Sequence, residues 1–158
     1  MRNLPSPPRV CLFRLADRIF ALDIRWVREV VEVAAVTRLP LAPAEVLGVF
    51  AVRGSILPLI HLSALLGLED RVGSSRAVVV RHAERQAALA VSEVLSLEAL
   101  EVTSPSAGLG VPSEYLSGQV IWRGETVPVL AVPKVLEALA ARVQGVGRES
   151  NQPLGALG

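Results

Sequence analysis

Short apolar runs separated by turn residues fill most of this chain, whereas long helical periods are rare. This pattern is typical of a mainly β protein with many short strands. Ten such runs are predicted to be strands, and each is short because turn residues follow it. The runs predicted to be strands are 10–15, 19–24, 30–39, 46–52, 56–60, 77–81, 87–91, 94–97, 120–122 and 126–130.

Helical spacing is confined to three pieces of the chain. Two are short, at 25–30 and 62–66, and the third follows Pro133. Proline suits the first turn of a helix, and the segment after it places Val135, Leu136 and Leu139 on one face. We therefore expect two short helical turns and one C-terminal helix.

The chain also repeats itself. Gly48, Arg53, Gly54 and Pro58 recur 70 positions later as Gly118, Arg123, Gly124 and Pro128. Upstream, the stretch RIFALDIRWV from Arg18 is answered by RQAALAVSEV from Arg85, at an offset of 67. The offset changes by three residues, as an insertion in a surface loop would allow. A period that occurs twice indicates a duplicated small module.

The duplication defines the expected architecture. Ten strands in two similar sets predict two small barrels or curled sheets, each too small to be comfortably stable alone. They should pack against each other, with a boundary near 70–76 and a partner surface between them. We expect the folded domain to span 9–143, with a flexible tail at 1–8 and a disordered tail at 144–158. Gly54, Pro58, Gly118, Gly124 and Pro128 mark the expected structural turns.

Composition excludes several classes of function. The chain is 51% hydrophobic, but no stretch of about 18 residues is free of charge and proline, as a membrane span requires. The start lacks the apolar core of a secretory signal, so we expect a cytoplasmic protein. One cysteine and two histidines supply no usual zinc ligand set. The net charge of +1 comes with scattered arginines, which does not favour nucleic-acid binding.

Candidates for catalysis are poor. His61 at a strand end is more typical of a structural group than of a base, and His82 lies in a predicted exposed turn. Ser92 has no G-x-S-x-G motif around it, and the phosphate-binding glycine motifs are absent. We therefore expect no enzyme, no catalytic residue, no metal and no cofactor, and we interpret the chain as a binding module.

Four features could carry binding: the segment with Trp26, Val27 and Glu29, the turn at Arg53, the leucine-rich stretch 56–66, and Trp122 beside Arg123. Each could equally be structural, since Arg53 flanks the same turn as Arg123. Glu29 differs, because at the offset of 67 it falls opposite Ser96. A charge present in one copy only is a better candidate for function than one present in both.

The segments FRLADRIFALDIRWVREVV, APAEVLGVFAVRGSILPLIHL and YLSGQVIWRGETVPVLAV, in this order, resemble the CheW-like domain of bacterial chemotaxis coupling proteins over about residues 10–140. The resemblance implies two tandem SH3-like five-stranded barrels, which form intertwined subdomains, and a non-enzymatic adaptor. Such an adaptor couples chemoreceptors, the methyl-accepting chemotaxis proteins, to the histidine kinase CheA in a signalling array at the membrane.

The resemblance also implies site residues. The family's receptor-contact valine and glutamate fall on Val27 and Glu29, its glycine on Gly48, its arginine on Arg53, and an apolar position of the second module on Leu97. The residues that contact the regulatory domain of the kinase stay unassigned. The resemblance implies neither direct membrane insertion nor nucleic-acid binding.

Two positions depart from the family pattern, because His61 and Ser92 stand where an aspartate is usual. These changes leave open a divergent scaffold of another chemosensory pathway, such as one for pili or gliding. A small-barrel module that binds peptides or nucleic acids is a further alternative, since SH3-like barrels host many ligands.

Overall fold

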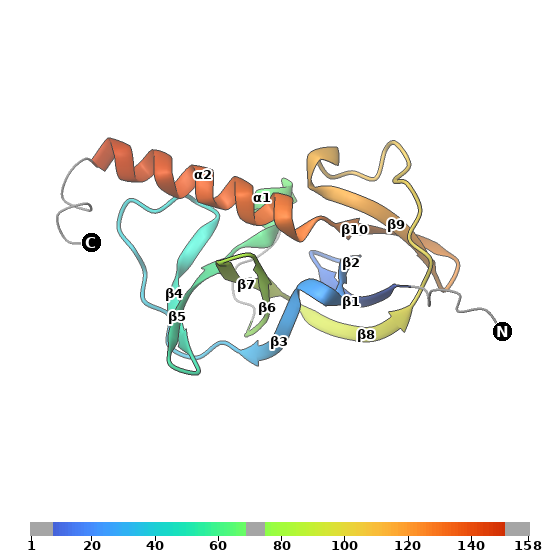
Figure 1. Ribbon diagram of the computed structural model, residues 1–158, viewed down its shortest axis with the longest axis horizontal. Helices are drawn as coiled ribbons and strands as arrows, with labels where there is room; N and C mark the ends of the chain where they lie inside the picture. Colours follow the sequence, from blue (N-terminus) through green and yellow to red (C-terminus); the bar gives the residue numbers. More distant parts are fainter. Residues whose placement is uncertain (1–7, 69–74, 151–158) are drawn as a thin grey trace.

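The computed structural model describes residues 8–68 and 75–150, apart from the side chains of residues 143–150 (Figure 1). The expected 1–8 tail and the 70–76 boundary fall largely outside these residues. The described elements are β1 (Arg9–Leu15), β2 (Arg18–Asp23), η1 (Ile24–Trp26), β3 (Val27–Glu32), β4 (Val46–Val52), β5 (Ser55–Ile60), α1 (Leu62–Leu66), β6 (Arg76–His82), β7 (Arg85–Val91), β8 (Glu93–Ala99), η2 (Ser113–Tyr115), β9 (Leu116–Trp122), β10 (Glu125–Leu130) and α2 (Val132–Ser150).

The described strands form two five-stranded sheets, which confirms the predicted mainly β fold and its two similar sets. Sheet A has the order β8-β1-β2-β10-β9, and sheet B has the order β3-β6-β7-β5-β4. If β1 to β5 are matched to β6 to β10, the two orders become the same. Both sheets are open, with β8 and β9 at the edges of one and β3 and β4 at the edges of the other.

The two halves of the chain exchange their first hairpins, so the sheets do not follow one another in tandem. The β1–β2 hairpin pairs with β8 and β10 of the second half, and the β6–β7 hairpin pairs with β3 and β5 of the first. A duplicated sequence offers each hairpin two equivalent edges, which is the usual basis of domain swapping. Because each sheet contains strands from both halves, neither half forms a complete sheet from its own residues.

The registers confirm the offset of 67 residues. A bulge in β3 lies between Val27, opposite Val80, and Glu29, opposite Val79. The corresponding irregularity between β8 and β1 places Val94 opposite Phe13 and Ser96 opposite Leu12. Glu29 and Ser96 are therefore structural equivalents, as the sequence predicted.

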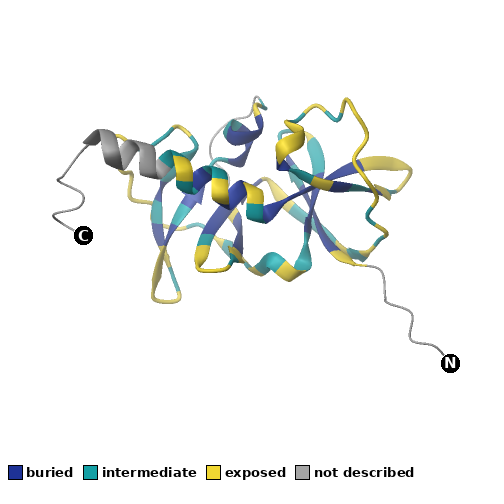
Figure 2. Ribbon diagram, turned by 45° about the horizontal axis from the view of Figure 1, so that its top comes forward, coloured by how far each residue is buried: buried dark blue, intermediate teal, exposed yellow. Residues whose placement is uncertain are grey.

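Three apolar clusters hold the molecule together. Sheet A encloses a small cluster that contains Leu12, and sheet B encloses one that contains Phe50. The largest cluster lies between the sheets and joins β1, β2, β6, β7 and both α-helices around Phe13 and Phe20, whose rings lie 6.0 Å apart. Figure 2 shows buried residues running through both sheets and exposed residues at the hairpin ends. The predicted packing of the two sheets against each other is therefore present.

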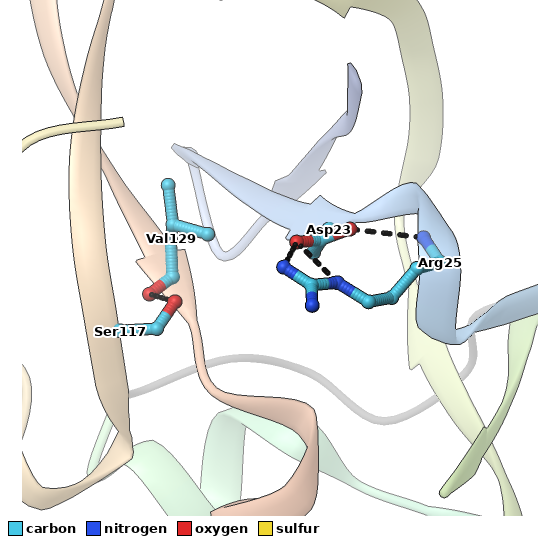
Figure 3. Close-up of polar contacts among 4 residues, drawn as sticks. All are labelled: Asp23, Arg25, Ser117 and Val129. Carbon is cyan, nitrogen blue, oxygen red and sulfur yellow. Dashed lines mark hydrogen bonds and ion pairs between the residues drawn. The ribbon is translucent and has the colours of Figure 1, made fainter. Parts of the chain in front are cut away.

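The connection from sheet A to sheet B passes through Asp23 and η1. Asp23 accepts hydrogen bonds from the backbone N–H of Arg25 at 2.9 Å and from its guanidinium at 2.8 and 3.0 Å (Figure 3). A side-chain carboxylate at this position satisfies the free N–H groups at the start of a helical turn. On the neighbouring pair of strands, the Ser117 hydroxyl donates to the Val129 carbonyl at 3.5 Å. The Asp23 cap fixes where the chain leaves β2 for β3.

Three predictions differ markedly from the structure. The helical piece expected at 25–30 is helical only at its start, because η1 ends at Trp26 and Val27–Glu32 is a strand. The strand expected at 30–39 ends at Glu32, and beyond it only the bridge between Thr37 and Val49 is described. The β-branched valines of this segment favour the strand. At the other end, α2 extends to Ser150, past the expected start of the tail at 144, in a stretch without proline.

Candidate protein-binding site

Glu29 and Arg53, both predicted site residues, lie together. The Nε of Arg53 donates to the two carboxylate oxygens of Glu29 at 2.9 and 3.2 Å. Glu29 lies on β3, and Arg53 lies in the turn between β4 and β5 with φ of 48°, followed by Gly54 with φ of 84°. Two consecutive residues with positive φ are typical of a tight hairpin turn. The turn therefore places the arginine side chain beside the glutamate.

This ion pair joins the two edges of sheet B. β3 is one edge strand, and the β4–β5 turn belongs to the hairpin that ends at the other edge. The side chain of Arg53 is 80% exposed and that of Glu29 is 27% exposed. An exposed pair of this kind contributes only about 0.2–1 kcal/mol to stability. Its two charged groups are therefore available to a partner at little cost to the fold.

Partly exposed apolar side chains lie on the edge strands β3 and β8. Val27 is half-buried against the cluster between the sheets. Val30 on β3 is 40% exposed, and Leu97 on β8 of sheet A is 50% exposed. In Figure 1 both strands lie on the side of the molecule away from α2. We name the set Val27, Glu29, Val30, Arg53 and Leu97 the edge surface.

Val30 was not among the predicted site residues. It precedes Leu97 by 67 positions, which is the offset that relates the two copies, so the repeat itself carried the signal. The two residues occupy equivalent places, Val30 opposite Val78 and Leu97 opposite Cys11. The edge surface therefore contains one exposed apolar residue from each copy.

Gly48, another predicted site residue, lies where the chain crosses itself. A Cβ on Gly48 would lie 2.4 Å from the carbonyl oxygen of Thr37, and the residue has φ of 153°. Its repeat, Gly118, has the same close approach, 2.6 Å from the carbonyl oxygen of Thr103. Both glycines neighbour the single bridges Thr37–Val49 and Thr103–Gln119. The lack of a side chain at these two glycines allows the crossing segment to approach each sheet closely. This structural role does not depend on any contact of Gly48 with a partner.

The repeated arginines share a backbone turn but not a side-chain contact. Arg123 and Gly124 have φ of 52° and 79°, close to the values at Arg53 and Gly54. The guanidinium of Arg123, however, lies over the Trp122 ring, 4.4 Å from its centroid. The Arg-Gly turn is therefore part of the duplicated scaffold, whereas the ion pair to Glu29 belongs to sheet B.

Groups suited to chemistry are dispersed or buried. Within the described chain, no cluster of three or more His, Cys, Asp or Glu residues is placed to hold a metal ion. Burial raises the pKa of the Cys11 thiol, which makes it a poor nucleophile. The Nε2 atom of His61 is buried and has no hydrogen-bond partner. Among residues 8–68 and 75–150, no helix is both long and apolar enough to cross a membrane.

Comparison with known proteins relates the whole fold to one family. A family model described as the CheW-like domain matches residues 9–140. The chemotaxis protein CheW of Treponema pallidum is 26% identical over 136 residues, which cover 80% of each chain. The probable chemotaxis protein CheW of Rhizobium etli is 34% identical over 90 residues, 54% of this chain and 58% of that relative. The match to the chemotaxis protein CheW of Rhizobium meliloti covers 44% of that protein, so the chain spans about half the length of these two relatives.

A solved structure has a similar fold. The scaffolding protein TtCheW from Thermoanaerobacter tengcongensis superposes with a TM-score of 0.75 at 24% identity, over 84% of this chain and 89% of that chain. At this identity the likeness is one of fold. The family model, by contrast, matches residues 9–140, most of the chain. The chain therefore belongs to the CheW-like domain family.

Proposed function

We propose that this chain is a non-enzymatic chemotaxis adaptor that couples chemoreceptors to a histidine kinase in the cytoplasm. Family membership supports the general role, since its relatives are named chemotaxis proteins and its structural neighbour a scaffolding protein. The single observation that carries the assignment to receptors is the Glu29–Arg53 pair on the edge of sheet B. A charged pair with exposed apolar neighbours suits recognition of a protein surface more than catalysis.

The proposed receptor contact uses the edge surface. The receptor's cytoplasmic tip is a helical hairpin in the family, and a helix packs through apolar residues on one face. Val27, Val30 and Leu97 would supply the apolar contacts. Glu29 and Arg53 would fix the register, because opposite charges in a partner position it more than they add affinity. The kinase would bind another face, to which no residues are assigned.

The proposed function can be tested by co-sedimentation. Purified chain is mixed with membranes that contain the receptor, and with matched membranes that lack it, and the pellets are compared. The proposal predicts recovery of the chain only with the receptor membranes. Equal recovery from both preparations would contradict the receptor assignment.

Arg123→Ala provides a matched control within the same turn type. This substitution removes the stacking of the Arg123 guanidinium on Trp122. We expect the free energy of unfolding to fall by about 0.5–1 kcal/mol as a result. Because Arg123 is outside the edge surface, receptor recovery should stay unchanged, whereas Arg53→Ala should reduce it. Chemical denaturation and the co-sedimentation assay measure the two effects. Equal loss of recovery in both variants would mean that the arginines act through the scaffold alone.

A further inference from the structure

An apolar pocket of about 520 Å³ lies on sheet B, on the side covered by α2. Its walls come from β4, β5, β7, the β6–β7 turn, the segment before β4 and one face of α2. They include Leu39, Pro58, Arg85, Ala87, Leu139 and Ala140. Arg142 of α2 lies 3.4 Å from the carboxylate of Glu45, which precedes β4. Leu39 at the rim is 45% exposed, so an apolar side chain remains open to solvent there.

The equivalent place on sheet A is filled. Arg18, the repeat of Arg85, donates a hydrogen bond to the carbonyl of Leu109. The guanidinium of Arg18 also lies over the ring of Phe20, 5.0 Å from its centroid. Val111 packs against the cluster between the sheets. The segment before β9 is therefore docked on its sheet through a carbonyl and an apolar side chain.

Two changes in the sequence open the site on sheet B. Ala87 stands at the position of Phe20, so the aromatic ring is missing. The segment before β4 is also shorter: Gly48 follows Thr37 by 11 positions, whereas Gly118 follows Thr103 by 15. In addition, the side chain of Arg85 has no hydrogen-bond or ion-pair partner among the described residues. The site therefore offers a donor and an apolar wall, but lacks the short segment that covers them in sheet A.

The chain carries a segment of matching sequence directly after the helix that lines the pocket. Pro153-Leu-Gly-Ala-Leu-Gly158 has a proline followed at four and five positions by leucine and glycine, as does Pro105-Ser-Ala-Gly-Leu-Gly110. Residues 151–158 contain no charged side chain. The helix rises about 1.5 Å per residue, so Ser150 lies roughly 17 Å beyond Leu139. Seven extended residues span up to about 23 Å. Leu157 can therefore reach back to the pocket.

We propose that the pocket on sheet B is the docking site for residues 153–158 of the same chain, with Arg85 donating a hydrogen bond to the carbonyl of Leu157. The segment then supplies in sheet B what residues 105–110 supply in sheet A. It leaves the edge surface free, because the pocket lies on the side of the molecule that carries α2. The inference is thus independent of the proposed receptor contact.

The test compares backbone amide signals of the isotope-labelled full chain in four forms. Leu157→Asp places a charge in the apolar site, and Asn151→Asp places the same charge outside the matched sequence. Arg85→Ala removes the donor, and Arg81→Ala is its control, because Arg81 donates to the carbonyl of Ala83 on the same hairpin. We expect Leu157→Asp and Arg85→Ala to shift the signals of Leu39 and Ala140, and the two controls to leave them unchanged.

A second measurement keeps the proposal falsifiable. Added synthetic peptide Asn-Gln-Pro-Leu-Gly-Ala-Leu-Gly should return the signals of Leu157→Asp toward those of the unmodified chain. The affinity of the peptide should fall at least about tenfold in the double variant that carries both Leu157→Asp and Arg85→Ala, as expected for a lost hydrogen bond to a charged group. Ala87→Phe, which restores the ring of sheet A, should abolish peptide binding in a folded protein. Unshifted pocket signals in Leu157→Asp would overturn the proposal, as would shifts that depend on protein concentration, since a second copy would then be the occupant.

Discussion

Glu29→Arg is expected to abolish receptor-dependent recovery of the chain while leaving it folded. The change removes the acceptor of the Arg53 guanidinium and places two cations together on the edge of sheet B. A central charged residue of an interface commonly costs about 2 kcal/mol or more when lost, which is roughly thirtyfold in affinity. The ion pair itself is exposed, so the free energy of unfolding should fall by no more than about 1 kcal/mol. Co-sedimentation and denaturation measure the two quantities on the same preparation.

Two further variants separate recognition from structure. Glu93→Arg breaks another exposed pair, in which Arg14 Nε lies 3.2 Å from Glu93, and should leave receptor recovery intact. The exchange Glu29→Arg with Arg53→Glu restores an ion pair of reversed polarity and should stay inactive. If the exchanged pair recovers receptor binding, the role of these residues is to hold the edges of sheet B together.

Gly48→Ala is expected to destabilise the fold strongly. The new Cβ would lie 2.4 Å from the Thr37 carbonyl oxygen and 2.7 Å from Val36 Cγ1, on a backbone with φ of 153°. Backbone strain and overpacking each cost on the order of 1–3 kcal/mol, so we expect a loss of about 3 kcal/mol or more in the free energy of unfolding. Receptor recovery should fall in parallel with the folded fraction, as measured by thermal unfolding.

Gly54→Ala is the matched control for this effect. Gly54 also has positive φ, 84°, but a Cβ there meets nothing within 4 Å. Its substitution should cost about 1 kcal/mol from backbone conformation alone. If Gly48→Ala is as stable as Gly54→Ala and still loses receptor recovery, Gly48 acts as a contact residue and not through the crossing with Thr37.

The repeat predicted the two sheets and the equivalence of Glu29 and Ser96, because matched sequence requires matched register. Which hairpins the two intertwined halves exchange could not be predicted. Both halves offer equivalent strand edges to the first hairpin of each half. The sequence is therefore equally compatible with hairpin pairing within a half and between halves. Residues 25–30 were assigned to a helix because the bulge at Arg28 disturbs the alternation expected of a strand.

The candidate site was likewise predicted only in part. The family resemblance named Glu29 and Arg53, but their contact joins residues 24 positions apart on an edge strand and a turn, which only the curvature of the sheet brings together. Val30 was missed because its exposure depends on β3 being an edge strand. Gly48 was assigned a binding role, and its close approach to Thr37 depends on a loop path that no local pattern encodes.

The central claim is that this chain joins a receptor to a kinase. Its most direct test is co-sedimentation of the purified histidine kinase with receptor membranes, measured with increasing amounts of the chain and with its Glu29→Arg variant. The account predicts that kinase recovery rises with the chain to a plateau and stays at background with the variant. Kinase recovery that is the same without the chain, or the same with the variant, would contradict it.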